Sequence, residues 1–65
     1  MIKLTRLNGA ELMVNDDLIE SIERTPETIL TMTDGKKFTI KDSAEEVIEK
    51  IVRFRRSIAL PDIKD

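Results

Sequence analysis

The chain has 65 residues and contains no histidine, cysteine, tryptophan or tyrosine. A zinc site built on His and Cys, a disulfide framework and a Cys–His nucleophile pair are therefore excluded. Eleven basic and thirteen acidic residues give a net charge of −2, which does not favour bulk attraction to nucleic acid or to an anionic membrane. Because so short a chain buries only about 60% of its unfolded surface, we expect it to gain stability as a homo-oligomer.

Two turn dipeptides predict two β-hairpins. Asn8-Gly9 and Asp34-Gly35 each lie between runs of β-branched and aliphatic residues, and both dipeptides are typical of two-residue type I′ turns. Residues 15–18 between the hairpins are expected to form a turn and residues 19–24 a strand, with a short helix as the alternative. Five antiparallel strands in a β-meander follow from this pattern.

The expected loop length also predicts which residues face each other in the first hairpin. A two-residue loop places Leu4 opposite Met13 and puts both on the face away from Leu12 and Val14. Apolar side chains then occupy both faces, so we expect one face, with Leu4 and Met13, to contact a partner.

In the second hairpin the same loop length pairs Ile29 with Ile40 and Thr31 with Phe38. This face is predicted to be the core. The opposite face is expected to be half solvated and holds Leu30, Met32, Lys37 and Thr39.

The clearest predicted helix spans residues 43–58. Ser43 and Glu46 have the spacing of a capping box. A stripe of Val47, Ile51, Phe54 and Ile58 would suffice to pack the helix on one sheet. The stripe is wider than that, which predicts an oligomer interface at Ile48, Val52 and Ile58. Residues 1–58 are thus expected to form one domain, and residues 59–65 a tail that breaks at Pro61.

The second half of this helix carries four cations and no acid across residues 50–57. Complementation of the helix dipole by solvated side chains is one interpretation. An acidic protein surface, an anionic lipid or nucleic acid would be the functional alternative. The chain has only two aromatic side chains, both phenylalanine, on which nucleotide bases could stack. We therefore do not expect nucleic acid as the partner. The candidate partner-binding residues are Lys50, Arg53, Arg55 and Arg56, together with Leu4 and Met13.

No residue pattern predicts catalysis or a cofactor. Asp16-Asp17 and Glu45-Glu46 are adjacent, so their side chains point apart, and they are better explained as turn and helix-start acids. The two glycines stand alone, and no calcium-loop spacing occurs. We therefore expect a non-enzyme without metal or cofactor. Without an apolar run of 18 residues or a signal peptide, it is expected to be cytoplasmic and to contact a membrane at most peripherally.

Three ordered blocks resemble the FlbD/SwrD family of short bacterial flagellar proteins. The blocks are Leu4–Gly9, Asn15–Glu23 and Thr25–Lys37, within a resemblance that covers about residues 1–56. Pro26-Glu27-Thr28 stands where Pro-Asp-Thr is common in the family. The resemblance implies a non-enzymatic protein that supports motor torque and swarming, through the stator units at the cytoplasmic face of the motor. It transfers no catalytic or ligand residues.

A partial resemblance points to the carbon storage regulator family of RNA-binding translational repressors. Met1–Arg6 and Leu12–Val14 are similar to its opening strand pair, and Glu45-Glu46-Val47 to its helix start. In that family a Leu-Thr-Arg-Arg run and an Arg near the helix contact RNA. Here Leu7 replaces the second Arg of the run, and Lys41 corresponds only approximately to the Arg near the helix. A small RNA-binding translational regulator is thus the alternative function.

Overall fold

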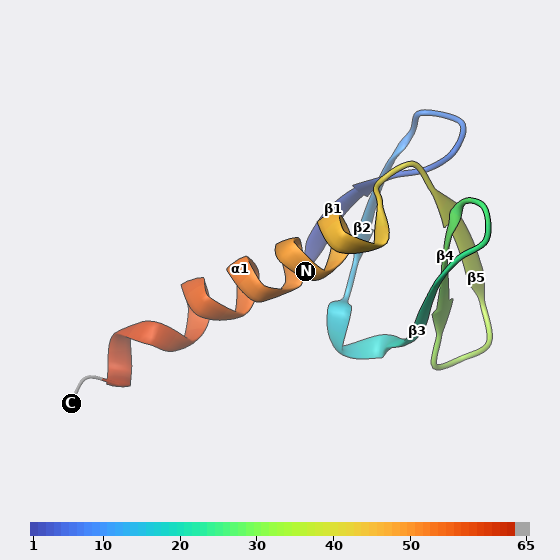
Figure 1. Ribbon diagram of the computed structural model, residues 1–65. Helices are drawn as coiled ribbons and strands as arrows, with labels where there is room; N and C mark the ends of the chain where they lie inside the picture. Colours follow the sequence, from blue (N-terminus) through green and yellow to red (C-terminus); the bar gives the residue numbers. More distant parts are fainter. Residues whose placement is uncertain (64–65) are drawn as a thin grey trace.

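Five antiparallel strands and one C-terminal helix form the fold, so the α+β prediction is confirmed (Figure 1). The computed structural model describes residues 1–63, with side chains for residues 1–58. A single 3-10 turn separates the second and third strands, which confirms the predicted turn and strand in this region. The elements are β1 (Ile2–Thr5), β2 (Glu11–Val14), η1 (Asp16–Leu18), β3 (Ile19–Arg24), β4 (Thr28–Met32), β5 (Lys37–Ile40) and α1 (Ala44–Ile63).

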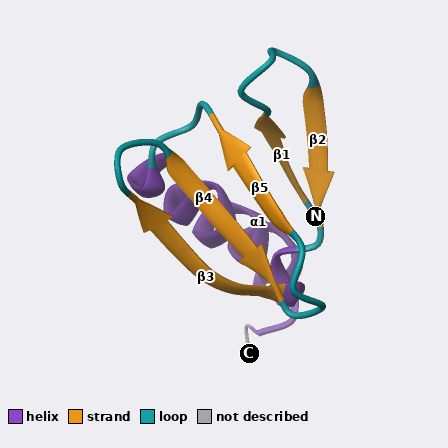
Figure 2. Cartoon of the chain, turned by 90° about the vertical axis from the view of Figure 1, so that its right-hand side faces the viewer, coloured by secondary structure: helices purple, strands orange, loops and turns teal. Residues whose placement is uncertain are grey.

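The strands are divided between two sheets. β1 and β2 form one hairpin, and β3, β4 and β5 form a three-stranded antiparallel sheet with α1 behind it (Figure 2). A bridge between Arg6 and Ile40 joins the sheets, and Lys41 N–H donates to the Thr5 carbonyl at 2.8 Å. The end of β1 therefore lies beside β5. The expected meander holds within each sheet, and η1 lies between β2 and β3.

Both hairpins have three-residue loops instead of the predicted two-residue turns. Arg6 N–H bonds the Ala10 carbonyl, and Met32 N–H bonds the Lys36 carbonyl, each at 2.8 Å. A type I′ turn needs positive φ at both central residues, but among the described residues only Gly9 and Gly35 have it, at 94° and 91°. This pattern fits a type I turn followed by a left-handed glycine.

The longer loop shifts the first hairpin by one residue and moves side chains to the other face. Leu4 pairs with Leu12 and is buried, with 1% of its surface exposed. Met13 pairs with Lys3, points to the opposite side and is 56% exposed. The prediction that Leu4 and Met13 share an exposed face is therefore wrong.

The same shift reverses the faces of β4. Leu30 pairs with Phe38 and is fully buried, and Met32 is buried beside it. Ile29 pairs with Thr39 on the outer side of the sheet and is only half buried. The core face predicted for the second hairpin is thus wrong for β4, because the Thr-Asp-Gly loop contains one residue more than the predicted turn, whereas Phe38 and Ile40 of β5 face the core as predicted.

One hydrophobic core joins the two sheets and the helix. Val47 of α1 is fully buried among residues of both sheets, and Ile51 and Phe54 pack against this core while half buried. The helix is thereby fixed on the strands over its first three turns. The buried strand residues of the core are Ile2, Leu4, Val14, Leu30, Met32 and Ile40.

The predicted capping box begins the helix. Glu46 N–H donates to Ser43 Oγ at 3.1 Å, and Ser43 N–H donates to Glu46 Oε1 at 2.8 Å. The predicted break at Pro61 is wrong, since the helical backbone continues to Ile63. Loss of one N–H donor weakens a helix at proline without always ending it. The side chains of the expected tail, 59–65, lie outside the described residues.

The second half of α1 projects beyond the strands (Figure 1). The molecule measures 43 × 22 × 19 Å, and its radius of gyration is 12.9 Å. A compact domain of this length would have a radius of gyration of roughly 10.7 Å. Ile58, which was expected to complete the packing stripe, lies on this projecting part and is exposed.

Candidate interaction surfaces

The four cations of the predicted basic cluster have different surroundings. Lys50 Nζ lies 2.9 Å from Asp42 Oδ2 and donates to the Lys3 carbonyl at 2.7 Å. Asp42 also accepts a 2.7 Å hydrogen bond from the Thr5 amide. Burial raises the pKa of Asp42, but the hydrogen bonds from Thr5 and Lys50 outweigh this and lower the pKa below its ordinary value. Lys50 therefore ties the helix to β1.

Arg55 makes a second link, to η1. Its Nε donates to Asp16 Oδ2 at 3.0 Å, and a terminal nitrogen contacts Asp17 Oδ1 at 2.7 Å. The Asp16 side chain is buried and also lies 3.3 Å from the amino group of Met1. Burial raises the pKa of Asp16, but its hydrogen bonds with Arg55 and this amino group hold it below its ordinary value.

Asp16 is a structural residue that sequence reasoning interpreted only as a turn acid. Asn15 Oδ1 accepts from the Asp17 amide at 3.1 Å, which starts η1 and directs Asp16 inward. The turn itself could be read from Asn-Asp-Asp. The partner could not, because Arg55 is 39 residues away.

The other two cations point into solvent. Arg53 pairs with Glu49 one helical turn earlier at 2.8 Å, and both side chains are more than half exposed. Arg56 makes no ion pair with any residue in the described part of the chain. Of the predicted basic cluster, Arg53 and Arg56 are thus available to a partner, while Lys50 and Arg55 hold the fold together.

An apolar groove lies next to Met13. The apolar side chains of exposed Met13 and Leu18 and of Met32 and Phe38 line it, together with the charged residues Asp34 and Lys36. Its volume is about 250 Å³. Exposed apolar surface of this kind marks interaction sites, and methionine adapts to partners of different shape. Met13 therefore remains a candidate contact residue. Leu4 does not, because it is buried and does not reach this surface.

The exposed apolar residues of α1 lie on two parts of the helix surface. Ile48 and Val52 are one turn apart and form a row, with 52% and 42% of their surfaces exposed. Ile58 borders a separate open hollow that Met1, Asp16 and Arg55 also line. The predicted oligomer interface is thus exposed at all three positions, but Ile58 does not continue the row of Ile48 and Val52.

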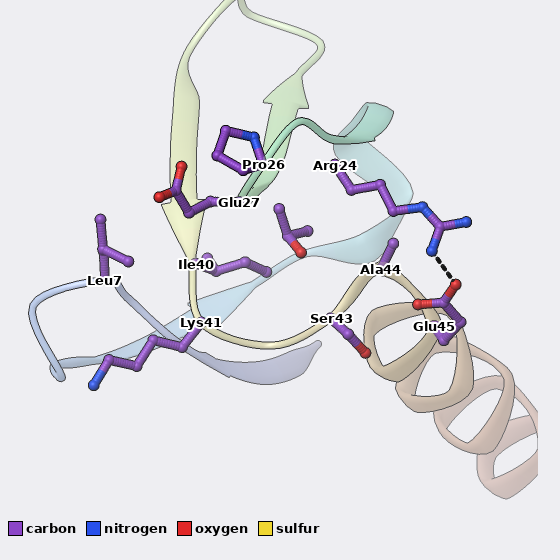
Figure 3. A pocket seen from close by; sticks show the side chains of 10 residues that line it. Leu7, Arg24, Pro26, Glu27, Ile40, Lys41, Ser43, Ala44 and Glu45 are labelled. Carbon is purple, nitrogen blue, oxygen red and sulfur yellow. Dashed lines mark hydrogen bonds and ion pairs between the residues drawn. The ribbon is translucent and has the colours of Figure 1, made fainter.

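A larger open cleft of about 560 Å³ lies where β3, β5 and the helix start meet (Figure 3). Leu7 and Lys41 lie at one end, and an ion pair between Arg24 and Glu45 marks the other. Ser43 faces the cleft, but its hydroxyl accepts the capping hydrogen bond from Glu46. Backbone N–H and Arg24 hydrogen bonds keep the pKa of Glu45 below its ordinary value, so this carboxylate is ionised rather than poised as an acid.

Within the described residues, no group of three acidic side chains is arranged to hold a metal ion. No described helix is both long and apolar enough to cross a membrane.

The family model for FlbD, flagellar and swarming motility proteins, matches residues 1–59. The chain belongs to the FlbD family. No curated protein and no solved structure matches the chain.

The three sequence blocks that resemble FlbD each build a turn. Asn8, Asn15 and Asp34 each accept a hydrogen bond from the backbone N–H two residues later, at 3.0, 3.1 and 3.0 Å. Such side chains replace a backbone acceptor and set the direction of the chain. The FlbD-like blocks therefore position the strands and η1, while the exposed surfaces around Met13 and along α1 are left for contacts.

Proposed function

We propose that this FlbD-family chain is a non-enzymatic accessory protein that supports the torque of the flagellar motor during swarming. It would act through protein contacts with stator components, at the cytoplasmic face of the motor. The family match over residues 1–59 carries this proposal. The exposed apolar side chains of Met13 and Leu18 support it.

The groove beside Met13 is the proposed contact surface. Met13 and Leu18 are exposed, and their substitution leaves the core intact because neither belongs to it. One acid, Asp34, and one base, Lys36, both line the groove, so its apolar side chains carry the proposed contact and its charges favour neither an acidic nor a basic partner. By contrast, Lys50 and Arg55 are engaged within the chain, which weakens the case for a contact through the whole basic cluster.

A complementation experiment tests this proposal. A flagellated host that lacks its own copy would carry the chain, the variant Met13→Asp with Leu18→Asp, or the control Leu7→Asp. Leu7 is as exposed as Leu18 but lies at the open cleft, not at the groove. We expect the chain and the control to restore swarming and the double variant to lose it at equal protein level. Full swarming by the double variant would exclude this surface.

Crosslinking from swimming cells identifies the partner. Stator components are expected with the chain and not with the double variant. Recovery of RNA, with binding that falls steeply as salt rises, would favour the carbon storage regulator alternative instead. Torque measured on tethered cells separates a motor role from one in flagellar number, since only a motor role lowers torque per motor.

A further inference from the structure

The exposed row of Ile48 and Val52 lies on a helix whose other apolar residues are already packed. Val47, Ile51 and Phe54 contact the core, so the row is a second apolar strip on the same helix. Neither Ile48 nor Val52 belongs to the core cluster or packs against it. Apolar surface left in water at two neighbouring positions is what an interface with another helix uses.

Charged residues line one side of this row in a fixed order. From the start of the helix they are Glu45, Glu49, Arg53 and Arg56, two acids followed by two bases. Helical spacing of three and four residues places them along the same edge as Ile48 and Val52. The Glu45, Glu49 and Arg53 side chains are each more than 60% exposed, so their charges remain accessible despite the pairs they make within the chain.

Read in the opposite direction, this order of two acids and two bases presents a base opposite each acid and an acid opposite each base. In an antiparallel second helix the bases lie opposite the acids of the first, so Glu45 faces Arg56 and Glu49 faces Arg53. Both pairings place the two-fold axis near residues 50 and 51. The same axis brings Ile48 against Val52 of the second copy. A parallel two-fold pair would place the two charged edges on opposite sides of the contact, where these residues could not pair with one another.

We infer that the row of Ile48 and Val52 binds a second copy of this chain in an antiparallel helix pair. The apolar residues supply the contact, and the flanking charges set its direction. A membrane surface fits less well, because an interfacial helix carries a basic polar face and this edge begins with two acids. The inference stands apart from the proposed contact with the motor, since the groove beside Met13 is not used.

The interface is small. One helix edge buries less than the roughly 800 Å² per partner that is typical of stable complexes, so a dissociation constant on the order of micromolar is expected.

Sedimentation equilibrium of the purified chain tests the inference. We expect a monomer–dimer equilibrium, and we expect Ile48→Asp with Val52→Asp to be monomeric at every concentration. Both positions are exposed, and circular dichroism checks that the fold is kept. Met13→Asp is the matched control and should dimerise like the unmodified chain. A dimer that survives the double substitution, or a chain that is monomeric up to millimolar concentration, would overturn the inference.

A charge exchange tests the antiparallel direction. Arg56→Glu places two like-charged pairs across the axis and should weaken dimerisation about tenfold. Adding Glu45→Arg in the same chain restores opposite charges in both pairs and should recover the affinity. No recovery would rule out this register. Because the protein is purified, neither result depends on whether the motor contact exists.

Discussion

Two cations of α1 that are neighbours in sequence, Arg55 and Arg56, have opposite roles. Arg55 contacts a buried aspartate and joins the helix to η1, whereas Arg56 has no ionic partner among the described residues. Lys50 and Arg53 differ in the same way, because Lys50 reaches β1 and Arg53 pairs only with its own helix. A cluster of like charges in sequence is therefore not one surface, since helical spacing directs its members to different sides.

The largest effect on stability is expected from reversing the charge of Arg55, the cation that contacts a buried aspartate. Arg55→Glu places a third carboxylate beside Asp16 and Asp17 and leaves buried Asp16 without its guanidinium partner. We expect a loss of about 2–3 kcal/mol in the free energy of unfolding, below the range for fully buried pairs because Arg55 is itself half exposed. Urea unfolding measures it. Arg56→Glu is the control, and an equal loss in both variants would contradict the distinction.

The link at Lys50 should have a smaller effect. Lys50→Met keeps most of the apolar stem but removes the donor to Asp42 and to the Lys3 carbonyl. We expect a loss of about 1–2 kcal/mol, because the remaining acceptors are only partly reached by water. Arg53→Met, on the exposed side, is the comparison in the same unfolding experiment. A variant as stable as the unmodified chain would show that Lys50 is not a structural link.

Acid should weaken both links gradually. Asp16 and Asp42 have pKa values below their ordinary value in the folded chain, so their stabilisation is fully present above the ordinary carboxyl pKa near 3.8. It is lost as the pH falls below this value and through the folded pKa values. Urea unfolding between pH 6 and pH 2 should show this decline, and Asp42→Asn should flatten it. An unchanged slope in that variant would contradict the assignment.

The exposed cations should matter least to the fold. Arg53→Gln and Arg56→Gln are each expected to change the free energy of unfolding by less than about 0.5 kcal/mol, since exposed ion pairs contribute little. The measurement uses a concentration at which the chain is monomeric. A larger loss in the Arg56 variant would reveal a contact with the fold.

Local features of the fold were predictable from sequence, and features that depend on distant partners were not. The capping box at Ser43 and the turn before β3 involve residues within a few positions, and both are confirmed. The hairpin positions were also right, but Leu-Asn-Gly and Thr-Asp-Gly suit a two-residue or a three-residue loop. The longer loop places Leu4 opposite Leu12 and Leu30 opposite Phe38, so that these apolar side chains face the core together.

The candidate surfaces show the same limit. Exposure of Ile48 and Val52 followed from the width of the helical stripe, which sequence reveals. The ion pairs of Lys50 with Asp42 and of Arg55 with Asp16 require the helix to lie across β1 and η1. Sequence alone did not predict these pairs. That placement results from the shared core, which no local pattern specifies.

The narrow connection between the two sheets has a consequence for how the chain folds. Few backbone hydrogen bonds cross from β1 to β5 around the Arg6–Ile40 bridge, and a two-stranded hairpin is marginal alone. The β1–β2 hairpin therefore depends on side chains from β4, β5 and α1. It is expected to unfold when α1 no longer packs against the strands. Amide hydrogen exchange in β1 should consequently occur only through global unfolding, so that the small domain behaves as one cooperative unit.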